Sequence, residues 1–171
     1  MLRFQYWKSQ LLHNRNTYLR SMATSEINIK NKRARFEYHL EDEFTAGIQL
    51  SGTEIKSIRA GKASILEAYC IEQEGEVWIR NMHITTYANG SIYNHQPRAD
   101  RKLLLNKKEI EKIIKFLKIK GNTLIPIKLF LSEKGWLKVL IACATGKKLH
   151  DKREDLKLKD DKREMDRALK R

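Results

Sequence analysis

Apolar residues recur along this chain with two distinct periods, and the longer period marks its clearest helix. Within 106–120 they fall at i, i+3, i+4 and i+7, the spacing of one helix face. These positions are Ile110, Ile113, Ile114 and Leu117. Asn106 stands where a helix cap belongs, Glu109 follows three residues later, and Gly121 comes directly after the segment. The pattern predicts an amphipathic helix over 106–120.

Much of the remaining apolar sequence alternates with a period of two, which is typical of half-buried strands. Turn residues join two pairs of these stretches, at Glu74-Gly75 and at 133–135, and each pair predicts an antiparallel hairpin. The expected strands lie in 36–50, 68–72, 76–80, 125–131 and 136–144. A short helix over 53–59, ended by Gly61, and a long basic loop over 88–101 complete the predicted elements.

The order of these elements predicts a fold that is mainly β with inserted helices. Strands and helices do not alternate regularly, so a parallel sheet is not expected. Closing the antiparallel strands into a small barrel of about six strands removes the exposed sheet edges that promote aggregation. A body over 26–145 is therefore followed by a tail over 146–171, whose apolar residues are too few for a fold of its own.

The first 25 residues form an extension with four basic residues and no acidic one. Three interpretations are open. In order of preference, the segment is an upstream extension with Met22 as the native start, a disordered basic arm, or an organellar transit peptide.

Charge narrows the class of partner. The 171 residues include 35 Lys and Arg against 21 Asp and Glu, a formal net charge of +14. So large an excess favours nucleic acid over acidic small molecules. A membrane surface fits less well, because no long amphipathic helix sets bulky aromatic residues opposite a basic face.

The apolar runs, the cysteines and the spacing of polar residues indicate the cellular compartment and whether the chain is an enzyme. No apolar run approaches the roughly 20 residues that span a bilayer, and no signal-peptide core is present, so a cytoplasmic protein is expected. Cys70 and Cys143 lie in apolar runs and are expected as buried free thiols. No residues fall at the spacing of a metal site, a catalytic constellation or a complete phosphate-binding loop. The sequence predicts neither an enzyme nor a bound metal or cofactor.

Basic clusters at element junctions are the better candidates for a binding site. They are 31–35, Lys56 with Arg59, 98–102 and 146–153. Side chains at such junctions can reach phosphates, and their recurrence beside loops indicates an RNA footprint. Tyr69, Tyr87 and Tyr93 are candidates for stacking on unpaired bases, although Tyr69 is better explained as core.

Five ordered motifs also carry a family resemblance. They are Asn-Lys-Arg-Ala-Arg-Phe-Glu-Tyr at 31–38, Gly-Thr-Glu-Ile-Lys-Ser-Ile-Arg-Ala-Gly-Lys at 52–62, Met-His-Ile at 82–84, Arg-Lys-Leu-Leu-Leu-Asn at 101–106 and Gly-Lys-Lys-Leu-His-Asp-Lys-Arg at 146–153. In this order they resemble the SmpB family, the SsrA-binding proteins that partner tmRNA in trans-translation. Thr45, Thr145 and Ala99 depart from the residues usual in that family, which puts individual contacts in doubt.

The resemblance implies an OB-type barrel with three helices and no catalytic activity. It implies that the chain binds the tRNA-like domain of tmRNA. It also implies that the chain, together with alanyl-tmRNA, elongation factor Tu and GTP, is brought to ribosomes stalled on messages without a stop codon. The motif residues that it associates with tmRNA contact, or with shaping the contact surface, are Asn31, Glu54, Lys56, Arg101, Lys102 and Leu104. The basic neighbours expected to join them are Lys32, Arg33, Arg35, Arg59 and Arg98.

The tail would be disordered when free and helical in the empty messenger channel. Its residues expected at the decoding-centre RNA are Gly146, Lys147, Lys148, His150, Asp151, Lys152 and Arg153. The main alternative is a general structural or ribosome-associated RNA-binding protein, and an RNA-processing enzyme is a third possibility.

Overall fold

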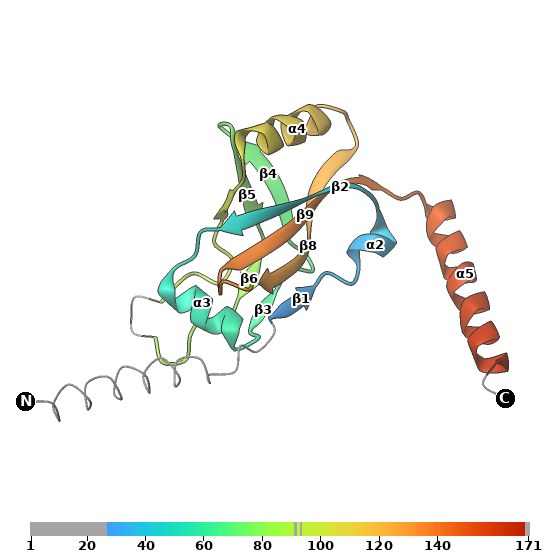
Figure 1. Ribbon diagram of the computed structural model, residues 1–171, viewed down its shortest axis with the longest axis horizontal. Coiled ribbons are helices and arrows are strands. Elements are labelled where there is room, and N and C mark those ends of the chain that lie inside the picture. The colour runs from blue at the N-terminus through green and yellow to red at the C-terminus, as the bar shows by residue number, and fades with distance from the viewer. Residues whose placement is uncertain (1–26, 91, 93, 170–171) are drawn as a thin grey trace, which may run out of the picture.

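The computed structural model describes residues 27–90, 92 and 94–169 (Figure 1), so the extension expected over 1–25 lies outside the described residues. The strands are β1 (Asn28–Lys30), β2 (Tyr38–Ile48), β3 (Ala63–Ser64), β4 (Tyr69–Gln73), β5 (Glu76–Arg80), β6 (His83–Ile84), β7 (Arg101–Leu104), β8 (Asn122–Leu131) and β9 (Leu137–Gly146). The helices are α2 (Ala34–Glu37), α3 (Gly52–Arg59), α4 (Lys107–Leu117) and α5 (Leu149–Ala168).

Six of these strands form a closed ring. The sheet runs β1-β8-β4-β5-β7-β2-β9, and an additional pairing of β8 with β9 closes the circle from β8 onward. All of its pairings are antiparallel, β1 adds to β8 outside the ring, and β3 pairs with β6 in a separate two-stranded sheet. The expected mainly antiparallel fold of about six strands is confirmed. The described residues form four helices: α2, α3 and α4 in the body, which is the number that the resemblance implied for the barrel, and α5 in the tail.

Both predicted hairpins are present. The turn between β4 and β5 uses Glu74 and Gly75, whose φ angles of 55° and 77° lie in the left-handed region that glycine tolerates best. The first long strand begins two residues later than the alternation suggested, at Tyr38, because α2 takes the residues before it. A register shift between Leu40 and Glu43 leaves a bulge in its pairing with β9.

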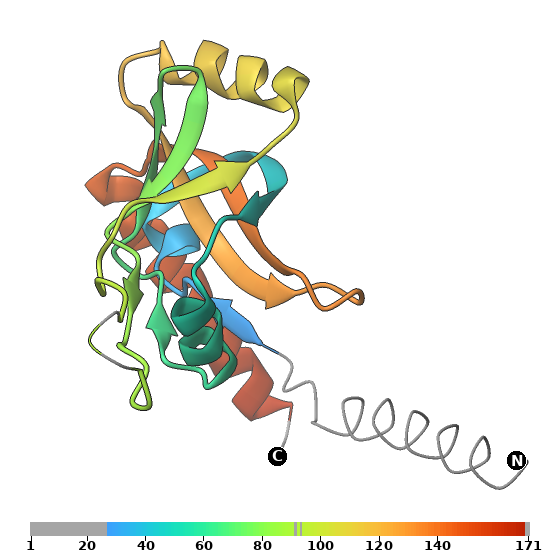
Figure 2. The same cartoon turned by 90° about the vertical axis from the view of Figure 1, so that its left-hand side faces the viewer.

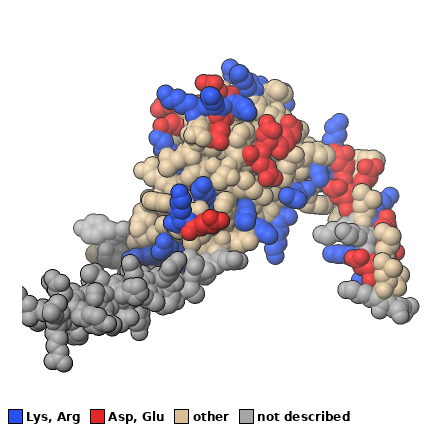
Figure 3. Space-filling view, in the orientation of Figure 1, with Lys and Arg blue, Asp and Glu red and all other residues tan. Residues whose placement is uncertain are grey.

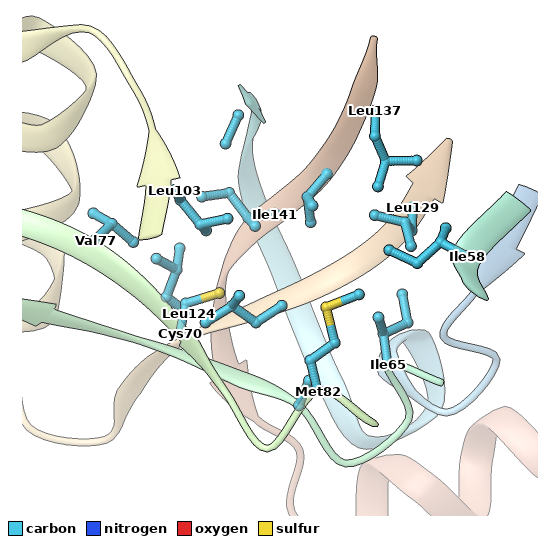
Figure 4. Close-up of a cluster of buried hydrophobic side chains, with 14 of the residues drawn as sticks. Ile58, Ile65, Cys70, Val77, Met82, Leu103, Leu124, Leu129, Leu137 and Ile141 are labelled. Carbon is cyan, nitrogen blue, oxygen red and sulfur yellow. The ribbon is translucent and has the colours of Figure 1, made fainter. Parts of the chain in front are cut away.

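The core fills the interior of the ring. Figure 4 shows side chains from β5, β7, β8 and β9 converging there, joined by Ile58 from α3 and by Met82. The fully buried members include Ile58, Ile79, Met82, Leu124, Leu129 and Ile141. Cys70 and Cys143 are buried free thiols, as expected. Burial raises the pKa of both, that of Cys143 to about 11 with the nearby acids Asp42 and Glu41 adding to the effect.

Helices α3 and α4 lie at opposite ends of the ring in both views (Figures 1 and 2). The predicted amphipathic helix is confirmed as α4, which packs against β8 and buries Ile113 completely. Glu109 caps it, since its carboxylate accepts a hydrogen bond of 2.8 Å from the Asn106 backbone N–H.

The tail continues directly from β9 into α5, which leaves the body and contacts it through α2 (Figure 1). Its sequence holds seven Lys or Arg and seven Asp or Glu, so the helix itself is electrically balanced. That the tail orders only on the ribosome stays a prediction. No helix in the described ranges combines the length and apolar composition needed to cross a membrane.

Candidate nucleic-acid interface

A buried ion pair joins α3 to β7. Glu54 Oε1 accepts a hydrogen bond of 2.8 Å from Arg101 Nε, and the two side chains are only 8% and 3% exposed. Glu54 also closes the capping box of α3, because its Oε2 accepts from the Ser51 N–H at 2.7 Å. Burial by itself raises the pKa of Glu54, but the Ser51 N–H and the Arg101 guanidinium outweigh it, so the pKa is lowered overall.

Arg101 also fastens the long basic loop between β6 and β7. Its Nη1 donates to the carbonyl oxygens of Met82 (2.8 Å) and Ala99 (2.7 Å), and its Nη2 donates to those of Gln96 and Pro97 (both 3.3 Å). All three guanidinium nitrogens therefore have protein partners. Arg101 and Glu54 therefore hold together the segments that carry other cations. That they take part in RNA binding, by contact or by shaping this surface, stays a prediction.

Those other cations point outward from α3 and the loop. Lys56 is exposed, with its Nζ 5.3 Å from the centre of the Tyr87 ring, and Arg59 and Arg98 are exposed as well. His95 ties the loop to α3, because its Nδ1 lies 2.9 Å from Thr53 Oγ1. The structure thus presents cations from two segments around one end of the ring, which is the arrangement that phosphate contacts require.

Lys102 and Leu104 follow Arg101 on β7 and have different surroundings. Lys102 is half-buried and forms an ion pair with Glu76 on the neighbouring strand β5. Leu104 is 54% exposed and lies against Gly47 of β2, where an added Cβ would come within 3.3 Å of the Leu104 Cβ. The glycine at 47 therefore allows a close approach that keeps Leu104 at the surface.

Asn31, in the first basic cluster (31–35), connects three segments of the chain through its side-chain amide. Its Oδ1 accepts from the N–H groups of Arg33 and Ala34, both at 3.2 Å, and its Nδ2 donates to the carbonyls of Ile65 (3.4 Å) and Pro126 (3.2 Å). The residue is 8% exposed and its amide is bonded within the protein, so in this structure it positions α2. Lys32 and Arg35 are exposed, whereas Arg33 is exposed but paired with Glu37 at 2.6 Å.

The same cluster holds the start of the tail. The Lys147 N–H donates to the Glu37 carbonyl at 2.9 Å, and its Nζ donates to the Arg35 carbonyl (3.0 Å) and to Asp155 Oδ2 (2.6 Å). The Lys147 side chain is only 10% exposed, and its ammonium group is bonded within the protein in this structure. These contacts fix the first turns of α5 against α2. That Lys147 contacts the ribosome stays a prediction.

Asp151 supports the same junction from the next turn. Its Oδ2 accepts from the Lys148 N–H at 3.1 Å and lies 3.4 Å from His39 Nε2. The pKa of Asp151 is lowered, first by the Lys148 N–H and then by His39. Gly146, Lys148, His150 and Arg153 are exposed, and Lys152 is half-buried.

The predicted site residues thus fall into two groups at different places. One gathers around α3 and the basic loop, and the other joins α2 to the tail. The notable misses of sequence reasoning are the partners Glu76, His95 and Asp155. The expectation that Tyr69 belongs to the core is wrong, because its side chain is 43% exposed. Among the residues that the structure describes, no three His, Cys, Asp or Glu side chains are grouped as a metal site.

Comparison with known proteins decides the family. The model of the SmpB protein family matches residues 28–171, the body and the tail together. The chain belongs to the SmpB family. The SsrA-binding protein of Phocaeicola vulgatus is 57% identical over 150 residues, which cover 88% of this chain and all of that relative. The SsrA-binding protein of a Nostoc species is 51% identical over 141 residues, covering 82% and 90% of the two chains.

A solved structure agrees with this SmpB assignment. A chain of the structure described as "tmRNA-SmpB: a journey to the center of the bacterial ribosome" has a TM-score of 0.61 and 41% identity, covering 71% of this chain and 85% of its own. The SmpB family consists of RNA-binding proteins without enzymatic activity, so the expectation that the chain is not an enzyme is confirmed.

Two of the residues that depart from the usual SmpB motifs lie on paired strands. Thr45 on β2 faces Leu140 in the register with β9, and Thr145 near the end of β9 faces His39. The Thr145 Oγ1 lies 3.1 Å from Asn122 Oδ1 and 3.3 Å from Glu41 Oε1, so its single hydroxyl proton can be donated to either oxygen. At this position the hydroxyl of Thr145 links β9 to the neighbouring strands β2 and β8.

Proposed function

We propose that this chain binds the tRNA-like domain of tmRNA (SsrA RNA) and delivers it to stalled ribosomes for trans-translation. As a member of the SmpB family, it binds tmRNA in that process. The observation that carries the finer proposal is the set of exposed cations on α3 and the basic loop, held in place by the buried Glu54–Arg101 pair. Such a rigid cationic rim suits an RNA that is recognised by its backbone shape.

The closed ring fits this role as an OB-type barrel. Barrels of that class bind nucleic acids with a strand face and the loops at its edge. Here the ring provides a rigid interior, and the loop over 85–100 and α3 form the edge. The RNA contacts are assigned to Lys56, Arg59 and Arg98. Lys102 and Leu104 on β7, and Lys32 and Arg35 at α2, are assigned as further contacts. Asn31, Glu54 and Arg101 act by positioning these residues.

The tail is assigned to the ribosome. Its exposed residues Lys148, His150 and Arg153, with Lys152, contact the decoding-centre RNA, while the following turns of α5 occupy the empty messenger channel. A 20-residue helix is about 30 Å long, which suits a channel that a folded domain could not enter. Elongation factor Tu with GTP takes part through alanyl-tmRNA and needs no separate surface on this chain.

The test compares two RNAs over a salt series. The full chain is titrated with a fragment of the tRNA-like domain and with an unrelated RNA of equal length, because nonspecific phosphate binding weakens steeply as salt rises. We expect a preference for the tRNA-like fragment that survives at physiological salt. Equal affinity for the two RNAs at every salt concentration would instead favour a general RNA-binding protein.

A pair of variants then separates the two surfaces. Lys56→Gln with Arg98→Gln is expected to weaken binding of the tRNA-like fragment, whereas removal of 146–171 is expected to leave it intact and abolish ribosome rescue. Both changes acting equally on RNA binding would contradict the assignment of separate roles.

A further inference from the structure

Helix α4 carries a cationic face that neither surface described above uses. Figure 3 shows Lys side chains gathered over α4 at the top of the molecule. At 100° per residue, five lysines share the side of this helix opposite its apolar stripe, the last of them at its C-cap. They are Lys107, Lys108, Lys112, Lys115 and Lys118, and all five are exposed. We define these five residues as the α4 lysine face.

The charges of this face are not balanced within the protein. None of its lysines forms an ion pair with another described residue. Of the two acidic residues on α4, Glu109 is engaged in the helix cap, which leaves Glu111 as the acidic residue on this side. Helix α5 differs, because its numbers of positive and negative charges are equal and some of its acids are paired, as Asp155 is with Lys147 and Asp160 with Arg163.

The arrangement also opposes the stability of the helix itself. Lys108 and Lys112 are four residues apart and Lys115 follows three later, so like charges face each other at spacings where they repel by a few tenths of a kcal/mol. Lys107 and Lys108 also lie in the first turn, where the positive end of the helix dipole disfavours cations. A polyanion docked on this face would relieve both effects.

From these observations we infer that the α4 lysine face is a second RNA-binding surface, which docks on the phosphate backbone of ribosomal RNA. The inference rests on the proposed function, because that function brings the protein to the ribosome with its α3 end already occupied. The face spans twelve residues, from Lys107 to Lys118, or about 18 Å of helix, enough to follow several consecutive phosphates. It lies at the end of the ring opposite α3 (Figures 1 and 2), so a bound tRNA-like domain leaves it open.

The experiment replaces three lysines of this face in the full chain. The Lys108→Gln, Lys112→Gln, Lys115→Gln variant keeps good helix formers at exposed positions, so it is expected to fold. The matched control, Lys30→Gln, Lys128→Gln, Lys134→Gln, removes the same charge from β1, β8 and the β8–β9 turn. Binding of both variants to vacant 70S ribosomes and to the tRNA-like fragment is measured over a salt series, with thermal melting as a check on folding.

We expect the α4 variant to bind ribosomes about tenfold more weakly than the control at physiological salt, with the slope of log affinity against log salt reduced by about three. Its affinity for the tRNA-like fragment should match that of the control. Equal ribosome binding by the two variants would overturn the inference, and so would an equal loss on both RNAs, which would indicate only a general charge effect. The proposed function is tested separately by the wild-type chain: if the wild type showed no preference for the tRNA-like fragment, the proposed function would be wrong, whatever the α4 variant does.

Discussion

Arg101 and Lys147 each join segments that are far apart in the chain through a positively charged side chain, but the surroundings of the two side chains differ. Arg101 is 3% exposed, its acidic partner Glu54 is 8% exposed, and four backbone carbonyls share its guanidinium. Lys147 is 10% exposed, but its partner Asp155 is 43% exposed and one carbonyl completes the contact. The contacts of Arg101 are therefore buried within the folded body. The contacts of Lys147 join the tail helix to the body through a partner that is more exposed to solvent.

The largest expected effect comes from breaking the buried pair. Arg101→Gln leaves the Glu54 carboxylate buried without its charge partner and removes hydrogen bonds to the loop, so we expect a loss of about 3–5 kcal/mol in the free energy of unfolding. Urea denaturation measures it. Arg98→Gln is the matched control, because it removes the same charge from an exposed position of the same loop and should change stability by less than about 0.5 kcal/mol.

The two variants also separate positioning from contact. Arg98→Gln is expected to weaken RNA binding in a fully stable protein. A variant at Arg101 that kept the stability of the wild type and lost only RNA affinity would show that the guanidinium meets the RNA directly.

An intermediate effect is expected from pH. The pKa of Glu54 lies below its ordinary value of 4.5 in the folded chain, so the carboxylate stabilises the fold above that pH. This contribution is lost as the pH falls through the lowered pKa, because the folded state then takes up the proton that it had resisted. We expect the free energy of unfolding to fall less in Glu54→Gln than in the wild type between about pH 6 and about pH 3. Parallel pH profiles would contradict this role of Glu54.

The smallest effect on stability is expected at the tail junction. Asp155→Asn removes an exposed partner of Lys147, so the free energy of unfolding should change by less than about 1 kcal/mol. The orientation of α5 should change instead. The measurement is the distribution of distances between labels at Lys134→Cys and Glu164→Cys, since the raised pKa values of Cys70 and Cys143 keep those buried thiols unreactive.

Asp161→Asn, on an exposed position farther along α5, is the control for this measurement. It should leave the distance distribution unchanged. If Asp155→Asn gave the same distribution as the control, the Lys147 contact would not be what holds the tail against α2.

Local patterns predicted the elements well, and long-range contacts explain what they could not predict. Helix α4 and both hairpins follow from periodicity and turn residues that are close together in sequence. The burial of Arg101 depends on Glu54, 47 residues away, and that of Asn31 on carbonyls 34 and 95 residues away. A charged or amide residue in a basic motif looks the same in sequence whether it faces RNA or a backbone carbonyl, so these roles needed the fold.

The family resemblance supplied the identity of the motifs but not the role of each residue in them. It grouped Arg101 with Lys102 and Leu104, which the structure separates into a buried, a half-buried and an exposed position. The tail over 146–171 has a net positive charge, and its excess of Lys and Arg lies outside α5, in the residues before and after the helix.

The equal numbers of opposite charges make α5 a polyampholyte. Because the positive and negative charges of such a helix largely cancel, α5 releases few counterions when it binds a phosphate surface. Added salt also weakens the attraction and the repulsion within the helix to a similar extent. The ionic-strength dependence of ribosome binding should then report chiefly the unpaired lysines of the body. A long tail of this composition can slide along the walls of an RNA channel without being trapped electrostatically at any one point of it.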